Sequence, residues 1–381
     1  MDSPFEVIEH IIPGQHLREW PRATGTSQEA VLRIHIKQYR PKDNLDPQPG
    51  DVTVIGAYGI GFPKELLGND HGWLDHARDL LHMTNVFRSE MPRPIVGIGH
   101  SFGANILAQL SLMHARLFSA LILFDPGINI FSLKETGAMK GVRLSASRRD
   151  SWPSREAAVQ SFRRSRFFSW DPRVLDAWVK HSIRDMPANR QTPGDTTASN
   201  KVTLVTSRHQ ETFTYFRPLY PYVQADGTVD RDGAPDFDPA MNIPADVRHL
   251  FPFYWSEGHM VVERLPHVRP SVLWVFGGSS DITLPPSSRS ETVRACGSGS
   301  NGSGGVAAGR VAEVVLEGHG HLFPFEIQRE MKHYYKAEKE YADWVCLPLY
   351  DKTILNEEFM AALGIPAAKK ESTNRRRSGK P

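Results

Sequence analysis

A serine held between two glycines is the first residue in this sequence whose surroundings suggest chemistry. Residues 99–103 read Gly-His-Ser-Phe-Gly, which fits the pattern G-x-S-x-G. In that pattern the serine lies on a sharp turn between a strand and a helix, where its hydroxyl is exposed and the helix N-terminus offers N–H groups to a developing oxyanion. Ser101 is therefore a candidate nucleophile for acyl transfer. The alternative is a glycine-bounded strand–helix turn without chemistry.

A serine nucleophile needs a base, and the base needs an orienting carboxylate. Two loops late in the chain supply them, with Asp281 in Gly-Gly-Ser-Ser-Asp and His321 in Glu-Gly-His-Gly-His. We favour His321 over His319 because it comes directly after the tight turn. Asp125, in Phe-Asp-Pro-Gly, is a rival acid, and we rank Asp281 ahead of it on its loop geometry. The alternative roles are a turn-capping aspartate and a packed surface histidine.

The elements around these residues predict a fold that brings them together. Hydrophobic patterns predict strands at residues 32–36, 52–56, 95–99, 120–124, 272–276 and 311–316, and helices at 73–87, 104–113 and 325–344. Alternating strands and helices indicate an α/β fold with a mostly parallel sheet. The carboxyl ends of its strands would then carry Ser101, Asp125, Asp281 and His321 to one edge.

The same pattern divides the chain into parts. We assign residues 1–127 and 270–346 to the core, 128–269 to a helical cap inserted after the fifth strand, and 347–381 to a C-terminal extension with a disordered basic tail. The glycine- and serine-rich stretch at 297–305 is expected to be a flexible loop.

An oxyanion needs a second backbone donor from the loop after residues 52–56, which reads Ala-Tyr-Gly-Ile-Gly-Phe-Pro. We expect the donors to be the N–H groups of Ile60 and Phe102.

Composition excludes several other classes of protein. The net charge is +2, there are two cysteines, and no apolar run approaches the ~18 residues of a membrane span. The sequence shows no zinc-ligand spacing, P-loop or dinucleotide fingerprint, so we predict no metal and no cofactor. The start lacks a signal segment, which favours an intracellular protein. The partner we expect is a small acyl substrate, with no nucleic acid and no membrane insertion, while no feature specifies an oligomeric state.

Five segments together resemble the α/β-hydrolase superfamily: Gly-Phe-Pro-Lys-Glu at 61–65, the helix from Trp73, Gly-His-Ser-Phe-Gly, Gly-Gly-Ser-Ser-Asp, and the stretch from Glu317 to Glu326. The first of these and the cap segment Trp-Asp-Pro-Arg-Val-Leu-Asp-Ala-Trp-Val-Lys are similar to fungal hydrolases of toxin-biosynthesis clusters and to the yeast peroxisomal lipase. The resemblance runs from about Val7 to Trp344. It implies the α/β-hydrolase fold, ester or acyl hydrolysis without a cofactor, and a role in secondary or lipid metabolism, often in peroxisomes.

The sequence departs from this family in three places. The loop that usually begins His-Gly begins here with Tyr58-Gly59, and the chain ends Gly-Lys-Pro rather than in a peroxisomal tripeptide, which leaves the cytoplasm as the alternative compartment. The third departure is a shortened connection after Glu65. A helix, a strand and a second helix with their connections need roughly 40 residues, whereas residues 66–94 number 29, of which the helix 73–87 uses 15.

One helix–strand unit is therefore missing, and Leu66–Gly72 is too short to supply it. Losing an interior strand leaves backbone groups unpaired and apolar area exposed. We expect residues 52–56 and 95–99 to pair directly, and the strand at 32–36 either to close against 52–56 or to lie at an exposed edge. We also expect a marginally stable, aggregation-prone chain with low or no hydrolase activity.

The main hypothesis is a serine hydrolase that cleaves an ester or thioester of a hydrophobic acid. An acyl-CoA thioesterase and a catalytically impaired hydrolase-fold binding protein or truncated gene product are the alternatives. Cap aromatics could line an acyl pocket or form the core of the cap, the second being favoured: Phe167, Phe168, Trp170, Trp178, Phe251, Phe253 and Tyr254. Cap arginines could meet CoA phosphates or, as we favour, form a solvated face: Arg148, Arg149, Arg163, Arg164 and Arg166.

Overall fold

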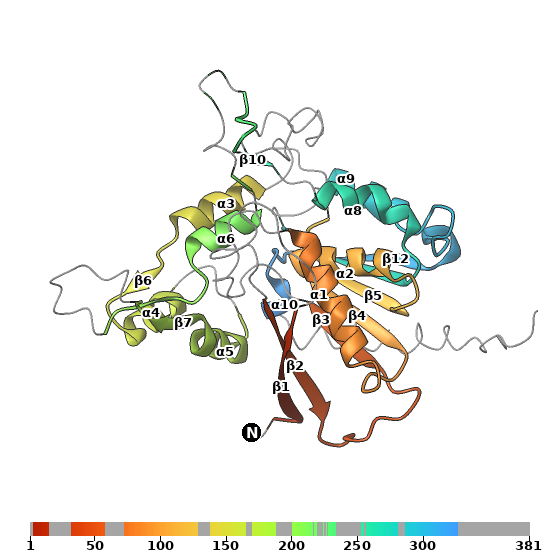
Figure 1. Ribbon diagram of the computed structural model, residues 1–381, viewed down its shortest axis with the longest axis horizontal. Coiled ribbons are helices and arrows are strands. Elements are labelled where there is room, and N and C mark those ends of the chain that lie inside the picture. The colour runs from red at the N-terminus through yellow and green to blue at the C-terminus, as the bar shows by residue number, and fades with distance from the viewer. Residues whose placement is uncertain are drawn as a thin grey trace, which may run out of the picture. The chain divides into compact units, whose positions relative to one another are not determined.

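The computed structural model (Figure 1) shows a parallel sheet with helices, joined to a cap of short helices and strands. It describes residues 3–14, 32–57, 72–128, 138–164, 170–187, 200–215, 217–218, 224, 226, 228–233, 253–254, 257–280 and 286–326. These residues belong to one compact unit, Met1–Asp343.

Five parallel strands form the central sheet in the order β12-β11-β5-β4-β3. Their bounds are β3 Thr53–Ala57, β4 Ile95–His100, β5 Ala120–Phe124, β11 Ser271–Gly277 and β12 Val311–Leu316. The predicted bounds of these strands are confirmed to within one residue at each end. Strands β4 and β5 are apolar on both faces, as expected for strands with a neighbour on each side and cover above and below.

The first face of the sheet carries the main hydrophobic core. Side chains of α1 (Trp73–Val86), α2 (Phe102–Met113), α8 (Glu257–Arg264), the 3-10 turn Leu265–His267 and α9 (Pro286–Ala295) pack there against alternate strand residues. The helix predicted at 73–87 is confirmed as α1, and α2 begins two residues before the predicted helix. Helix α8 packs in this core although it falls within the range assigned to the cap.

On the second face a smaller cluster joins Ile122, Phe124, Val275 and Phe323, the last from α10 (Phe323–Glu326). The helix expected at 325–344 otherwise lies outside the described residues. No helix in the described part of the chain has the length and apolar character to cross a membrane.

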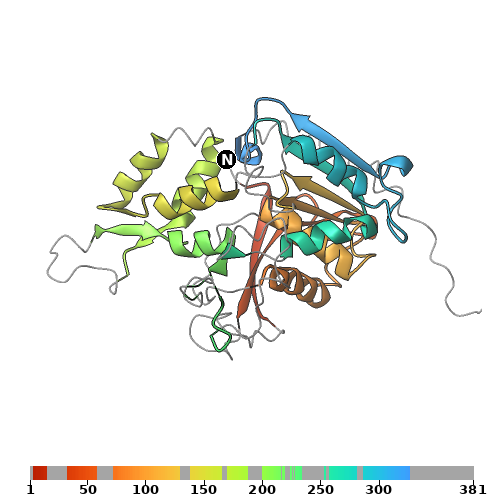
Figure 2. The ribbon, with the colours of Figure 1, turned by 90° about the horizontal axis from the view of Figure 1, so that it is seen from above.

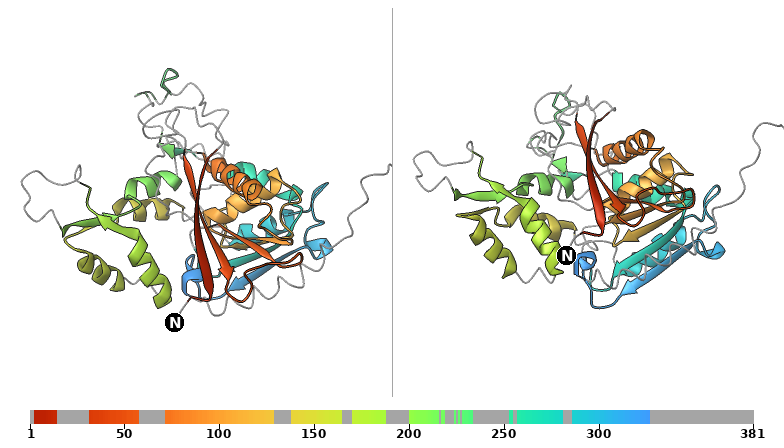
Figure 3. Two further views of the ribbon diagram at one scale, coloured as in Figure 1. Left: turned by 60° about the horizontal axis from the view of Figure 1, so that its bottom comes forward. Right: turned by 90° about the horizontal axis from the view of Figure 1, so that it is seen from below.

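The pairing expected of the two strands that carry the oxyanion and nucleophile loops is confirmed. Strands β3 and β4 pair directly, from Thr53 with Ile95 to Ala57 with Gly99. Strand β2 (Arg33–Pro41) pairs instead with β1 (Phe5–Pro13) in a separate antiparallel sheet, seen in red in Figure 3. Within the described ranges, β3 therefore has a partner on one side only.

Exposure along β3 agrees with an absent neighbour. Val54 points to the second face and is 50% exposed, and a Cβ placed on Gly56 would meet no atom within 4 Å. An interior strand of a doubly covered sheet has no such open face. Among the described residues, β3 is thus an edge of the sheet with part of its apolar surface in water.

The cap has a small core of its own. It contains α3 (Ala138–Ser147), β6 (Ser151–Trp152), α4 (Arg155–Arg163), α5 (Pro172–Ser182), β7 (Ile183–Asp185), β8 (Val202–Leu204), α6 (Arg208–Tyr215), β9 (Arg217–Pro218) and β10 (Phe253–Tyr254). The sheet β6-β8-β7 lies beside α4 and α5 (Figure 2). Trp152, Ala158 and Ile183 are buried in this core, with Phe162 and Trp178 packed against them.

The prediction of a flexible loop at residues 297–305 is wrong. Backbone N–H groups of this stretch donate to the turn before β11: Gly297 to the Leu265 carbonyl at 2.9 Å, Gly299 to Pro266 at 2.9 Å and Ser303 to Val268 at 3.0 Å. A composition rich in glycine and serine predicts freedom in isolation, but here these backbone bonds hold the loop against the core.

Candidate active site

Ser101 lies at a strained turn between β4 and α2. Its φ of 55° and ψ of −118° place a non-glycine residue in the left-handed half of backbone space. A Cβ on Gly99 would lie 2.6 Å from the Cα of Ala104, so glycine is required where the helix returns past the strand. The Ser101 N–H donates to the Phe124 carbonyl at 2.9 Å, and the Ser101 carbonyl accepts from the Gly127 N–H at 2.9 Å. These bonds fix the turn that holds the hydroxyl.

His321 reaches the Ser101 hydroxyl. Its Nε2 lies 3.0 Å from Ser101 Oγ, and its Nδ1 lies 2.5 Å from Asp125 Oδ2. Because a carboxylate only accepts, Nδ1 carries the proton and Nε2 is left to accept from the serine. His319 turns elsewhere, with its Nδ1 3.8 Å from Glu326 Oε2. The structure thus brings the serine, the histidine and a carboxylate into one line of contacts.

The carboxylate in that line is Asp125, the residue that the sequence analysis ranked second. Strand β5, which ends at Phe124, is the direct neighbour of β4, so Asp125 emerges beside the nucleophile turn. Asp281 lies outside the described residues. The ranking of Asp281 ahead of Asp125 is therefore corrected, because Asp125 is the carboxylate that accepts the hydrogen bond from His321 Nδ1. Both loops follow adjacent strands, and loop composition alone does not show which side chain reaches the histidine.

Asp125 is fully buried, yet its surroundings favour the ionised form. Burial raises the pKa of its carboxyl, but the hydrogen bond and charge of His321, with further hydrogen bonds from Ser280 and Gly277, outweigh burial and hold that pKa below its ordinary value of 3.8. The carboxylate is therefore available to orient the imidazole and to balance a positive charge that forms on it.

One of the two predicted oxyanion donors can be placed. Phe102 is the first residue of α2, so its N–H lies in the first turn of the helix, next to Ser101. Its ring meets the ring of Trp73 at 4.5 Å between centroids, which ties α1 to the start of α2. Ile60 and Tyr58 lie outside the described residues.

Within the described ranges, no group of three His, Cys, Asp or Glu side chains could hold a metal ion.

His100 is a site residue that the sequence analysis missed. It is buried, its ring lies 4.9 Å from the His321 ring, and its Nε2–H donates to the His321 carbonyl at 2.9 Å. Burial first, and then the neighbouring charge of His321, lowers the pKa of His100 from 6.5 to about 3. His100 is therefore neutral and fixes the backbone of the residue that contacts Ser101. Its position before the serine in Gly-His-Ser-Phe-Gly was the available signal.

This burial makes stability depend on pH. The folded chain protonates His100 near pH 3 and the unfolded chain near pH 6.5, so the unfolded state binds more protons between these values. We expect the free energy of unfolding to fall as pH decreases through this window, by on the order of 1.4 kcal/mol per unit. Denaturant titrations from pH 7 to pH 4 should show a shallower fall in His100→Gln. Equal slopes in the two proteins would contradict this expectation.

Two of the cap aromatics named in the sequence analysis have contacts that can be described, Trp178 and Trp170. Trp178 packs on Phe162 at 4.3 Å between ring centroids, within the core of the cap. Trp170 contacts Phe325 at 5.1 Å, and Phe325 in turn meets His100 at 5.6 Å, so this tryptophan approaches the site through one ring. Phe253 and Tyr254 form strand β10, and Phe167, Phe168 and Phe251 lie outside the described residues.

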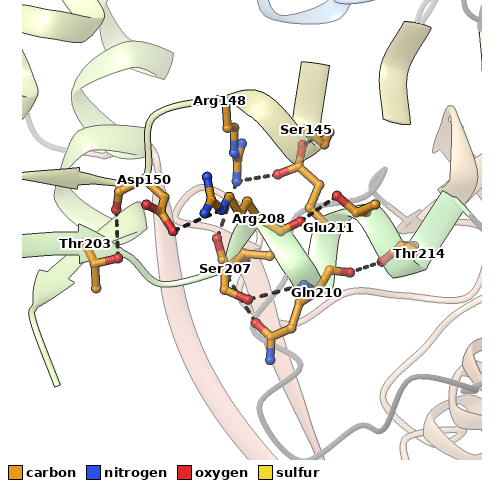
Figure 4. A network of polar contacts seen from close by, with 11 residues as sticks. Ser145, Arg148, Asp150, Thr203, Ser207, Arg208, Gln210, Glu211 and Thr214 are labelled. Carbon is orange, nitrogen blue, oxygen red and sulfur yellow. Dashed lines mark hydrogen bonds and ion pairs between the residues drawn. The ribbon is translucent and has the colours of Figure 1, made fainter. Parts of the chain in front are cut away.

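Three of the five cap arginines contact neighbouring side chains of the cap. Figure 4 shows Arg148 paired with Glu211, which also accepts from the Ser145 hydroxyl at 2.7 Å. The guanidinium of Arg149 lies 5.6 Å from the centre of the Trp152 ring, and Arg163 pairs with Asp176 at 3.6 Å. Arg164 caps the end of α4, and Arg166 lies outside the described residues. These contacts engage Arg148, Arg149 and Arg163 within the cap, and the solvated face stays a prediction.

Ser101 lies on a strand–turn–helix and is linked through His321 to Asp125. The comparison with protein families agrees with this arrangement. A family model described as the alpha/beta hydrolase family matches residues 52–330, more than half of the chain. The chain belongs to the alpha/beta hydrolase family. Among solved structures, this hydrolase is similar to the peroxisomal alpha-beta-hydrolase Lpx1 of Saccharomyces cerevisiae, with a TM-score of 0.64 and 15% identity over 95% of this chain and 96% of that chain. At this identity the likeness shows the fold.

Two relatives are more similar in sequence. This hydrolase is 36% identical to a type I acyl-CoA thioesterase, mpaH, of Penicillium roqueforti, over 89% of this chain and 91% of that protein. It is 31% identical to the abhydrolase domain-containing protein AFT2-1 of Alternaria alternata, over 67% of this chain and 84% of that protein. The resemblance to a fungal group of α/β-hydrolases is confirmed, and the chain is a hydrolase.

The first alignment also bears on the shortened connection. It spans 412 positions but includes 89% of this 381-residue chain, about 339 residues, so about 73 aligned positions have no counterpart here. This difference is large enough to include the helix–strand unit that the sequence analysis expects to be missing.

Proposed function

We propose that this hydrolase cleaves acyl thioesters by covalent catalysis, with Ser101 as nucleophile, His321 as base and Asp125 as orienting acid. The observation that carries the proposal is the unbroken contact from Ser101 Oγ to His321 Nε2, at 3.0 Å, and from His321 Nδ1 to Asp125 Oδ2, at 2.5 Å. Each contact lies within the reach that proton transfer requires.

The reaction follows from this geometry. As Ser101 Oγ bonds to the carbonyl carbon, its proton passes to His321 Nε2, and the buried charge of Asp125 stabilises the imidazolium. The Phe102 N–H at the start of α2 donates to the oxyanion. The carbon–sulfur bond then breaks, and His321 protonates the departing thiolate. Water, deprotonated by the same histidine, then attacks the acyl-serine. The bond between the acyl carbon and Ser101 Oγ breaks, His321 returns its proton to that oxygen, and the acid is released.

The thioester is favoured over a simple ester by the relatives. The mpaH proteins of Penicillium roqueforti and Penicillium brevicompactum, named type I acyl-CoA thioesterases, are 36% identical over 89% of this chain. Because the alignments with these relatives include most of the core and the cap, they support the same class of substrate for this chain, which is a CoA thioester of a hydrophobic acid.

A direct assay separates the two substrate classes. We expect a medium-chain acyl-CoA to have a higher kcat/KM than the ethyl ester of the same acid, and Ser101→Ala to abolish hydrolysis of both. Raising the salt concentration should reduce the preference for the acyl-CoA over the ethyl ester, because screening weakens the attraction between the CoA phosphates and basic side chains. Preference for the ethyl ester at both salt concentrations would contradict the acyl-CoA assignment while leaving the serine mechanism intact.

A further inference from the structure

The turn that follows β11 touches the acid and the base loop at the same time. The Gly277 N–H donates to Asp125 Oδ1 at 3.2 Å, and the Ser280 hydroxyl donates to Asp125 Oδ2 at 2.5 Å. The same turn bonds to the loop that leads to His321, through the Gly278 N–H to the Leu316 carbonyl at 2.8 Å and the Ser279 N–H to the His319 carbonyl at 2.9 Å. We call residues 277–280 the β11 turn. It connects the carboxylate to the loop of the histidine that the carboxylate orients.

The β11 turn is itself held in place. The Ser280 N–H donates to the Gly277 carbonyl at 3.1 Å, which closes the turn, and Arg289 donates to that carbonyl at 3.0 Å. Arg289 is buried, with its guanidinium 5.1 Å from the centre of the Phe276 ring. A Cβ on Gly277 would lie 2.7 Å from the His319 carbonyl oxygen, so the loop of the base packs directly on the turn. Ser280 therefore presents its hydroxyl from a fixed backbone.

Both oxygens of Asp125 are used. Oδ1 accepts from the Gly277 N–H, and Oδ2 accepts from both His321 Nδ1 and Ser280 Oγ. Hydrogen bonds to an ionised acceptor are short and strong, and they fix its plane. Without the Ser280 hydroxyl, one of the three donors is lost, and the carboxylate keeps only one donor besides the histidine.

We propose that Ser280 is a positioning residue for the reaction: its hydroxyl holds the Asp125 carboxylate in the plane in which Oδ2 meets His321 Nδ1. The proposal rests on the function proposed above for Asp125 and His321 and goes beyond it. In this arrangement the loop after β11 supplies a supporting hydroxyl through Ser280, while the acid comes from the neighbouring strand, β5. Ser280 does not touch the substrate and acts through Asp125.

The test compares three variants of the full chain. Ser280→Ala removes the hydroxyl, Ser280→Thr keeps it, and Ser279→Ala is a matched control at the exposed neighbouring position, whose backbone rather than side chain bonds to the His319 loop. We expect Ser280→Ala to lower kcat for acyl-CoA hydrolysis roughly tenfold with KM within about twofold. Ser280→Thr should recover most of the loss, and Ser279→Ala should match the wild type.

A second readout is independent of turnover. In protein labelled with ¹⁵N-histidine, the downfield proton resonance of His321 Nδ1–H reports its bond to Asp125. It should move in Ser280→Ala and stay in place in Ser279→Ala. An unmoved resonance in Ser280→Ala, or equal losses of kcat in Ser280→Ala and Ser280→Thr, would overturn the proposal. If the wild type hydrolyses no acyl-CoA, the proposed function fails, and the resonance still decides the role of Ser280.

Discussion

Asp125→Asn should lower kcat/KM for acyl-CoA hydrolysis by about 10³–10⁴-fold, whereas Asp281→Asn should change it by less than about twofold. The amide at position 125 would offer an N–H to His321 Nδ1, so the imidazole would turn to the tautomer that carries its proton on Nε2. That nitrogen then faces the Ser101 hydroxyl as a donor and no longer serves as a base. Steady-state kinetics of the two variants measure the difference.

The pair of variants is its own control, since both replace one carboxylate by one amide in adjacent loops. Asp125 accepts from His321, Ser280 and Gly277, and all three donors remain in Asp281→Asn. Similar losses in both variants would mean that both carboxylates contribute. A loss confined to Asp281→Asn would reverse the assignment.

Restoring the missing helix–strand unit is the second change with a large expected effect. A segment taken from a thioesterase relative and inserted between Leu66 and Leu67, which lie outside the described residues, should pair with the open edge of β3. It would cover Val52 and Val54, which are 42% and 50% exposed. Burying apolar surface contributes about 25 cal/mol per Å², which for a whole strand amounts to several kcal/mol. We expect the melting temperature to rise by roughly 5–10 °C.

Activity should rise with stability in this experiment, because β3 leads into the loop predicted to carry the oxyanion donor Ile60. A glycine–serine linker of the same length at the same position is the matched control. It should leave the melting temperature unchanged or lower it, since a longer loop without structure adds only closure entropy. If the chain as it stands melts cooperatively at the temperature of its longer relatives and hydrolyses acyl-CoA at a similar rate, the unit is dispensable.

Much of the fold could be predicted because the local signals agree with each other. The apolar runs at residues 95–99 and 120–124 predict buried parallel strands. The glycines around Ser101 predict a strand–helix turn. The oxyanion loop and the nucleophile loop must face each other, which predicted direct pairing of β3 with β4, and the structure shows this pairing. Strand β2 does not pair with β3 in the described residues and lies at an edge, which was one of the two outcomes expected for residues 32–36, but its pairing with β1 in a separate sheet was not predicted.

The predictions that were wrong or missing concern residues whose roles depend on contacts between segments that are distant in sequence. Asp125 and Asp281 both follow core strands, and only the packing of the β11 turn on Asp125 shows how that carboxylate is held. Ser280 acts through a carboxylate that is distant in sequence, so no local pattern marks it, whereas His100 is marked only by its place before Ser101 in Gly-His-Ser-Phe-Gly. The loop at 297–305 is ordered by bonds to residues 265–268, which glycine content alone does not predict.

The central claim is that Ser101 is a nucleophile activated by His321. A fluorophosphonate probe forms a covalent bond with such a serine even in an enzyme of low turnover, and mass spectrometry of the digested protein identifies the modified peptide. The account predicts modification at Ser101 in the folded protein, with none at that position after heat denaturation or in His321→Ala. A folded sample that stays unmodified, or one modified at a residue other than Ser101, would contradict it.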